Sequence, residues 1–261
     1  MKRSGAADLP LKVFNINTSE VTYEEKVSGE VNRWKRQMMK RPGYFNKISK
    51  AVQNKINSWI PENIHKGITV TIKQMVRGVL FGANKITSKK NALVDLLARD
   101  LAADEKIKIY QHTAATEGAI TGAGGILLGL ADFPLLLALK FKLLFELASV
   151  YGYDTDNYKE RLYILHIFQL AFSSARHRKD VFIAMLDWDK KVNNMPDDIH
   201  LFDWRTFQQE YRDYIDIAKM AQLVPIIGAP VGAVANYALV KKLGKTAKNA
   251  YRMRRHDNGE R

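Results

Sequence analysis

The chain contains no cysteine among its 261 residues. This absence excludes disulfides, thiolate metal sites and cysteine nucleophiles, and it fits a reducing compartment. The first residues, MKRSGAADLPLKVFNIN, also lack the apolar stretch of a secretory signal, because no hydrophobic segment follows the two basic residues. Together these absences predict a cytoplasmic protein.

Acidic residues are scarce relative to basic ones. The chain has 27 Asp and Glu against 41 Lys and Arg, which gives a net charge of +14. This excess favours anionic partners, namely lipid head groups, nucleic acid or acidic proteins. Hydrophobic residues make up 46% of the chain, which is enough for a sizeable core and argues against a wholly disordered protein.

The alternating apolar and polar pattern of half-buried strands is nearly absent, whereas apolar residues at intervals of three and four recur throughout. Thr22 and Glu25 have the spacing of a capping box, and Asn157 is placed to cap a later helix. The fold class is therefore predicted to be all-α. Helices are expected over about 22–40, 45–59, 61–79, 88–110, 135–153, 157–172 and 179–194.

These helices are expected to form one compact multi-helix bundle. The length of the chain suits a single large domain, which we place at residues 19–255. A flexible N-terminal tail over residues 1–18 and a disordered C-terminal end over residues 256–261 complete the predicted organisation.

Long apolar runs are few, and two of them are rich in glycine. They read TEGAITGAGGILLGLADFPLLLALK over residues 116–140 and LVPIIGAPVGAVANYALV over residues 223–240. Glycines four residues apart leave one helix face without side chains, so that another backbone can approach closely. We predict two glycine-rich helical hairpins that pack together through Gly118, Gly122, Gly125, Gly129, Gly228 and Gly232.

The same two blocks raise the question of a membrane. A membrane-spanning helix needs about 20 apolar residues, but Asp132 and Pro134 interrupt the first block, and Pro225 and Pro230 interrupt the second. The mean hydropathy of the chain is also negative, at −0.26. Three interpretations stay open: core hairpins of a bundle, shallow insertion into a bilayer, and full membrane spans.

Basic residues without acidic neighbours follow the second glycine-rich block. Residues 241–255 and residues 31–50 each hold seven basic residues and no acidic one. Anionic head groups attract such segments by about 1 kcal/mol for each Lys or Arg near the surface. A solvated tail is the alternative. We predict contacts with an anionic membrane surface through Lys241, Lys242, Lys245, Lys248, Arg252, Arg254 and Arg255.

Motifs of known catalytic chemistry are missing from the sequence. It has no HExxH, Walker A, GxGxxG or GxSxG pattern, so we predict neither a cofactor nor a metal site. Asp132, Glu117 and His112 would provide an acid and a base if the first glycine-rich block folds back on itself. The alternative for Asp132 is structural, because it is placed to cap the helix that follows.

Three segments resemble the EcsC family of bacterial proteins. They are IPENIHKGITVTIKQMVRGVLFGANKIT, EGAITGAGGILLGLADFPLLLALKFKLLFELASVYGYD and LVPIIGAPVGAVANYALVKKLGKTAKNAYR, in this order. The resemblance covers residues 22 to 255 approximately. It implies a bacterial protein of the cytoplasm or of the inner face of the membrane, in a family named for a protein encoded beside an ABC transporter. It transfers no catalytic residue.

The leading prediction is an accessory, non-enzymatic protein that associates peripherally with the inner face of a bacterial membrane, with a membrane transporter or a secretion process as its context. One alternative is a helical hydrolase that acts on lipid or peptide through Asp132, Glu117 and His112. The other is nucleic-acid binding through the basic segments, which the charge permits but no known motif supports.

Overall fold

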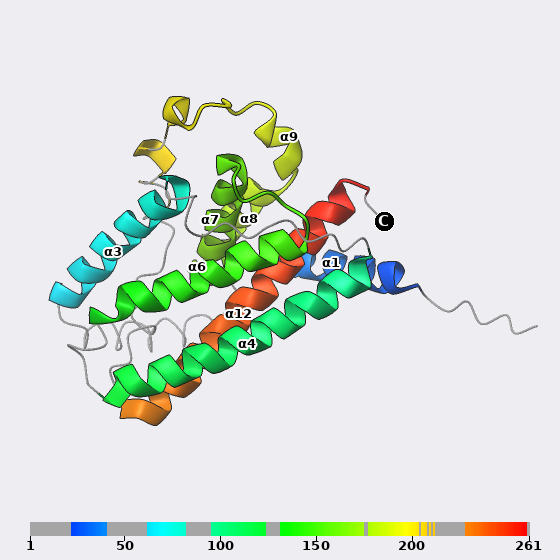
Figure 1. Ribbon diagram of the computed structural model, residues 1–261. Helices are drawn as coiled ribbons and strands as arrows, with labels where there is room; N and C mark the ends of the chain where they lie inside the picture. The colour runs from blue at the N-terminus through cyan, green and yellow to red at the C-terminus, as the bar shows by residue number, and fades with distance from the viewer. Residues whose placement is uncertain are drawn as a thin grey trace, which may run out of the picture.

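The structure, a computed structural model, describes residues 22–40, 62–81, 95–123, 131–174, 177–203, 205–207, 209, 211 and 228–259. Within these ranges every regular element is a helix, which confirms the predicted all-α fold. Figure 1 shows their arrangement as a bundle. The elements are α1 (Tyr23–Met39), α3 (Glu62–Phe81), α4 (Leu96–Ala123), α6 (Phe133–Val150), α7 (Tyr158–Phe172), α8 (Arg178–Met185), α9 (Trp188–Val192), the 3-10 turn η2 (Ile199–Leu201) and α12 (Gly228–Asp257).

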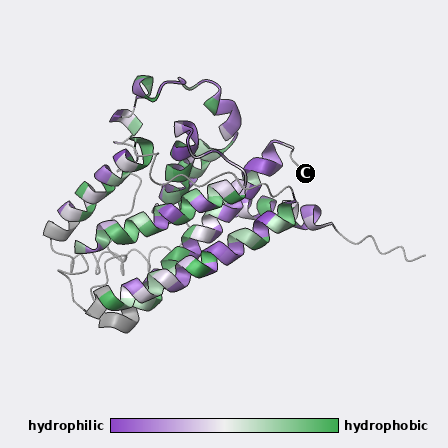
Figure 2. Cartoon of the chain, viewed as in Figure 1, coloured by the Kyte–Doolittle hydropathy of each residue, from purple (hydrophilic) through white to green (hydrophobic). Residues whose placement is uncertain are grey.

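Helices α6 and α7 form the centre of the core. The sequence of α6, FPLLLALKFKLLFELASV, is apolar on almost all sides, which is typical of a helix that other helices surround. Figure 2 shows hydrophobic residues along most of α6 and a mixed pattern along α4. Phe141 of α6 and Phe168 of α7 stack with their ring centroids 4.7 Å apart. The two helices therefore share one apolar interior.

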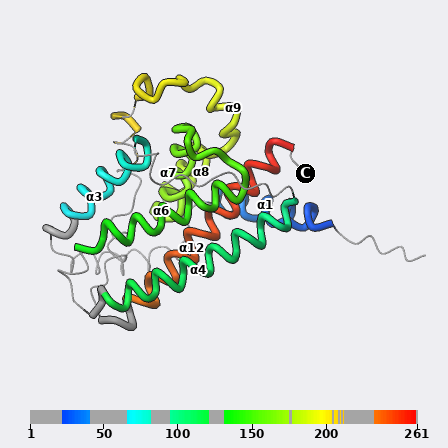
Figure 3. Tube along the Cα trace, viewed as in Figure 1, coloured from blue at the N-terminus to red at the C-terminus, as the bar shows by residue number. Residues whose placement is uncertain are grey.

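The two long helices α4 and α12 lie side by side and run in opposite directions, as the chain path in Figure 3 shows. Two glycines permit this approach. A Cβ atom added to Gly118 would lie 2.6 Å from the carbonyl oxygen of Gly232, and one added to Gly244 would lie 2.5 Å from Ile107. Such distances are far inside van der Waals contact, so positions without side chains set the separation of the helices.

The predicted caps are present at two helices and missing at a third. The capping box of Thr22 and Glu25 opens α1, and the Asn157 side chain accepts a backbone N–H in the first turn of α7. Asp132 precedes α6, but its side chain makes no capping hydrogen bond. The capping interpretation of Asp132 is therefore wrong. Pro134 in the first turn of α6 already removes one N–H that would need a partner.

The two glycine-rich blocks adopt different arrangements. Residues 116–123 end α4 and residues 133–140 begin α6, so the first block joins two antiparallel helices. The second block differs from the prediction, because residues 228–240 are the first part of one helix, α12. Pro230 lies in the first turn of α12, where a missing N–H is tolerated. Gly125 and Gly129 lie outside the described residues, and Gly122 and Gly228 are helical.

Some predicted boundaries shift, and others lie outside the described residues. The N-terminal tail and the helix expected over 45–59 lie outside the described residues. Helix α4 begins at Leu96 and continues to Ala123, well past the predicted end at residue 110. Helix α12 continues to Asp257, two residues beyond the predicted domain end, and Lys35 of α1 forms an ion pair with Asp257 at 2.5 Å.

None of the helices in the described ranges combines the length and the apolar composition that crossing a membrane requires.

Replacing Gly118 with alanine tests the close approach of α4 and α12. The new Cβ would overlap the Gly232 carbonyl group, so we expect the free energy of unfolding to fall by roughly 1–3 kcal/mol in urea titrations followed by circular dichroism. The matched control is Gly29→Ala in α1, where the surrounding space is open. Alanine at residue 29 should stabilise the protein by up to about 1 kcal/mol. Equal effects of the two substitutions would contradict the helix contact.

Candidate functional site along helix α12

Within the described part of the chain, three clusters of buried charge lie along α12. Their central members are Arg252, Arg254 and the pair of Asn236 with Lys140. A buried ionised group is stable only where counter-charges and hydrogen bonds replace its water. Each cluster is therefore either a structural joint between helices or a site where chemistry is possible.

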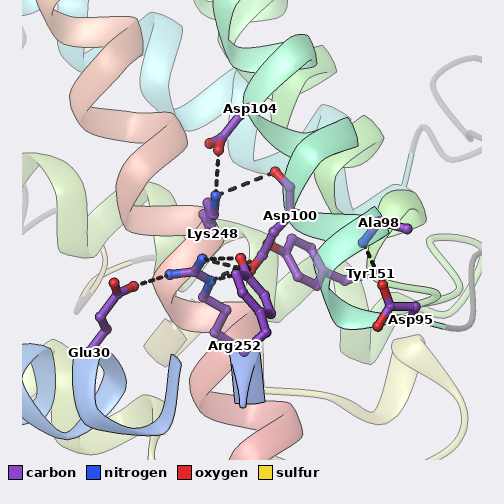
Figure 4. A network of polar contacts seen from close by, with 9 residues as sticks. Glu30, Asp95, Ala98, Asp100, Asp104, Tyr151, Lys248 and Arg252 are labelled. Atoms are coloured by element: carbon purple, nitrogen blue, oxygen red, sulfur yellow. Dashed lines mark hydrogen bonds and ion pairs between the residues drawn. The ribbon is translucent and has the colours of Figure 1, made fainter. Parts of the chain in front are cut away.

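The first cluster surrounds Asp100 of α4, which is 1% exposed (Figure 4). Arg252 donates to the Asp100 carboxylate from Nε at 2.9 Å and from Nη2 at 2.6 Å. The hydroxyl groups of Tyr23, at 2.6 Å, and of Tyr151 donate to the same carboxylate. Glu30 accepts from Nη1 of Arg252 at 2.9 Å. One carboxylate thus joins α1, α4, α12 and the end of α6.

The titration behaviour of this first cluster indicates a structural role. Burial alone would raise the pKa of Asp100, but hydrogen bonds from Arg252, Tyr151 and Tyr23 outweigh it and hold this pKa below its usual value. Burial and the neighbouring Asp100 raise the pKa of Tyr23 to about 12. These shifts favour an ionised Asp100 and a protonated Tyr23 at neutral pH, which is the arrangement that holds the hydrogen bonds of the cluster in place.

The second cluster surrounds Arg254. Its Nη1 donates to Glu160 of α7 at 2.5 Å, and its Nε donates to Asp189 of α9 at 2.9 Å. The guanidinium group lies 3.9 Å from the ring centroid of Tyr153, which is cation–π geometry. An open cavity of about 400 Å³ lies beside this cluster. Arg254 links the carboxylates of Glu160 in α7 and Asp189 in α9 to α12, so the second cluster also fits a structural contact between helices.

The third cluster surrounds Lys140 of α6, which is fully buried at 0% exposure. Its Nζ donates to Asn236 Oδ1 at 3.1 Å and to the Leu136 carbonyl at 3.2 Å. Asn236 in turn donates to the carbonyl group of Gly232 at 3.3 Å. Burial lowers the pKa of Lys140 to about 7, and the charge of Glu117 only partly offsets that effect. Lys140 can therefore gain or lose a proton near neutral pH.

The structure brings together only part of the predicted set Asp132, Glu117 and His112. Burial raises the pKa of Glu117, which also interacts electrostatically with Lys140 and Asp132. His112 instead lies exposed, and its ring centroid is 5.9 Å from that of Tyr237. Five residues along a helix turn a side chain by about 140°, so His112 and Glu117 point to different sides of α4. The predicted acid–base set does not form one site.

Lys140 and Asn236 belong to the third cluster although sequence reasoning did not select them. One signal was present, because Lys140 is a charged residue within the otherwise apolar run of α6. Asn236 had no comparable signal, since it lies 96 residues from Lys140 along the chain. Within the described residues no group of His, Asp and Glu could hold a metal ion.

Three of the predicted anion-contact residues lie inside the protein. Arg252, Arg254 and Arg255 are each 8% exposed. Acidic side chains from other helices neutralise the first two, as described above. The prediction that these arginines contact a membrane surface is therefore corrected, because a bilayer could reach them only by unpacking the bundle.

The remaining predicted contact residues are lysines nearer the middle of α12. Lys248 pairs with Asp104 of α4 at 2.7 Å and is partly buried. Lys241, Lys242 and Lys245 are exposed. Within the described part of the chain, these three lysines are therefore the members of the predicted set that lie at the surface.

Comparison with known proteins identifies clear relatives. The model of the EcsC protein family matches residues 25–255. Protein EcsC of Bacillus subtilis (strain 168) is 43% identical over 235 residues, which cover 90% of this chain and 97% of the relative. The uncharacterized protein YdbA of the same organism is 27% identical over 248 residues, covering 87% of this chain and 90% of the relative. No solved structure matches.

Replacing Lys140 with methionine tests its titration near neutral pH. In the unfolded chain Lys140 keeps its proton up to its usual pKa of 10.5, whereas the folded protein releases it above about pH 7. Between these values the unfolded state binds more protons, so stability should rise with pH by up to about 1.4 kcal/mol per pH unit. We expect Lys140→Met to remove this slope in urea unfolding between pH 8 and 9, about one to two units above the lowered pKa.

Lys142→Met is the matched control for that experiment, because Lys142 lies on the same helix but is exposed. The control should keep the slope of the wild-type protein. The same slope in wild type and Lys140→Met would show that Lys140 does not titrate in this range.

Replacing Asp100 with asparagine tests whether the first cluster is a structural joint. Arg252 would keep a buried charge without its main counter-ion, so we expect a loss of about 3–5 kcal/mol in the free energy of unfolding. Asp104→Asn, one turn further along α4, removes a partly exposed ion pair with Lys248 and should cost less than about 1 kcal/mol. A loss of similar size in both variants would refute the special role of Asp100.

Proposed function

The chain belongs to the EcsC protein family, and on that premise we propose that it is an accessory protein which associates peripherally with an anionic membrane surface. The observation that carries the proposal is an exposed apolar end of the bundle with exposed lysines a short distance above it. A membrane protein such as a transporter is the partner class that fits this location.

The apolar end lies where α4 ends and where α6 and α12 begin (Figure 1). Each of these helices exposes a large apolar side chain there: Ile120 is 64% exposed, Leu135 is 59% exposed and Val234 is 70% exposed. We call this end, defined by Ile120, Leu135 and Val234, the tip. Large exposed apolar groups gathered at one end of a molecule are typical of an interaction surface.

Exposed lysines follow the tip along α12. At a rise of 1.5 Å per residue, Lys241 lies about 10 Å and Lys245 about 17 Å from Val234 along the helix axis. If the tip enters the outer part of a bilayer, these ammonium groups reach the head groups or lie within about two Debye lengths of them. Each lysine there would contribute about 1 kcal/mol of attraction to an anionic surface.

The alternative functions have less support. A hydrolase would need an acid and a base beside an accessible substrate, whereas Lys140 is fully buried and His112 lies on another side of α4. Nucleic-acid phosphates would also attract the exposed lysines. Such binding would leave the apolar tip without a role, which is why we favour a membrane surface.

Charge reversal of Lys241, Lys242 and Lys245 tests the proposal. Wild-type protein should co-sediment with phosphatidylglycerol vesicles and much more weakly with phosphatidylcholine vesicles. Changing all three lysines to glutamate should weaken binding by at least about a hundredfold, since three attractions of about 1 kcal/mol are lost. Val234→Asp should reduce the binding that persists at high salt, because that component depends on insertion of the tip.

The matched control reverses the charge of three exposed basic residues in α1 and at its end, which are Arg33, Arg36 and Lys40. Helix α1 packs at the far end of α12, where Lys35 contacts Asp257, so this variant should keep most of the vesicle binding. Equal losses in the two triple variants would point to attraction by total charge alone. Absence of wild-type binding to both kinds of vesicle would end the membrane proposal.

A further inference from the structure

A groove between α4 and α6 points to a ligand for this protein. The groove has a volume of about 280 Å³ and lies on the outer surface of the bundle. Both apolar and charged side chains form its walls. They are Lys106, Ile109, Tyr110 and Thr113 of α4 and Leu139, Lys142 and Glu146 of α6.

The groove leads toward the tip. Tyr110 of α4 donates a hydrogen bond to Glu146 of α6 at 2.6 Å, and the two helices run in opposite directions. Ten residues further along α4 is Ile120, and eleven residues back along α6 is Leu135. By helix periodicity Ile120 and Leu135 lie on the faces of α4 and α6 that carry the groove residues Thr113 and Leu139. An acyl chain that leaves the groove along these faces would therefore run toward the tip.

The charges of the groove favour an anion. Lys106 pairs with Glu146 at 2.9 Å, and Tyr110 donates to the same carboxylate. The negative charge of Glu146 is therefore already neutralised. Lys142 is exposed and forms no ion pair with any described residue. Among the described residues the positive charge of Lys142 is thus uncompensated, and the apolar side chain of Leu139 lies one turn nearer the tip.

We propose that this groove binds one anionic lipid of the membrane, with its head group at Lys142 and one acyl chain along Leu139 toward Ile120 and Leu135. Lys142 lies seven residues from Leu135, which is about 10 Å along the axis of α6. Lys241 lies the same number of residues from Val234 along α12. The head group would then lie at the level of its neighbours in the bilayer, and the chain would point into the hydrocarbon layer. The inference rests on the proposed function only for the source of the lipid.

Binding of monomeric single-chain lipids tests the groove without a bilayer. Lysophosphatidylglycerol and lysophosphatidylcholine with the same acyl chain differ mainly in net charge, and calorimetry below their critical micelle concentrations gives both dissociation constants. We expect the full chain to bind the anionic lipid about five- to tenfold more tightly, as one added charge contact predicts. Lys142→Glu should abolish or reverse this preference.

A second variant tests where the acyl chain of the lipid binds. Thr113 is exposed on the groove wall, and its hydroxyl donates only to the Ile109 carbonyl of its own helix. Thr113→Trp should therefore fold normally, which circular dichroism checks, and its indole ring should fill the groove. We expect both lipids to bind about tenfold more weakly to this variant. Unchanged affinities would overturn the proposal.

The control variant is Lys245→Glu, which lies on α12 away from the groove. It should keep the preference for lysophosphatidylglycerol while it weakens binding to phosphatidylglycerol vesicles. Three results would refute lipid binding in the groove. Lys245→Glu could lose the preference, Lys142→Glu could keep it, or the wild-type protein could fail to bind either lipid. Vesicle binding without lysolipid binding would refute lipid binding in the groove but leave the peripheral membrane function standing. The reverse result would support the groove and refute the peripheral membrane function.

Discussion

The bidentate pair of Asp100 and Arg252 is the constraint on which the arrangement of the bundle depends. The pair is buried, so the charge of each residue is stable only while the other holds its position. It fixes α12 against α4 at one end, and Gly118 meets Gly232 at the other end of the same two helices. A slip by one turn would separate the charges at one end and press side chains into backbone at the other. Charge and close packing thus specify a single register.

Sequence periodicity predicted the helices well because helix formation and amphipathic faces depend on residues within a few turns of one another. The capping box of Thr22 and the glycine faces that carry Gly118 and Gly232 follow from the same short-range patterns. The burial of Arg252 and Arg254 could not be predicted in this way. Their counter-charges, Asp100 and Glu160, lie 152 and 94 residues away along the chain. A run of basic residues without local acids therefore resembled an exposed segment, available to a membrane surface or to solvent.

The basic part of α12 separates into two chemical types. The arginines at its end are buried, and the three lysines nearer the tip are exposed. This division follows from the side chains themselves. A guanidinium group is planar, more weakly hydrated than an ammonium group and able to bind a carboxylate through two parallel hydrogen bonds, so it is the better cation for a buried pair. The ammonium group of lysine holds its water more strongly and remains at the surface.

The rigidity that the buried pairs provide bears on how the proposed membrane contact would work. A flexible basic tail attracts anionic lipids at any depth, whereas cations on a fixed bundle stand at fixed heights above the tip. Helices α6 and α12 both begin at the tip, and Lys142 and Lys241 each lie seven residues beyond an exposed apolar residue, Leu135 and Val234. Both lysines thus lie about 10 Å from these apolar residues along their helix axes. In the proposed orientation this spacing places both near the head groups, so that insertion of the tip and attraction of anionic lipid reinforce each other. The Asp100–Arg252 pair, at the opposite end of α12, contributes by preventing the helices from sliding and so keeping the lysines at fixed distances from the tip.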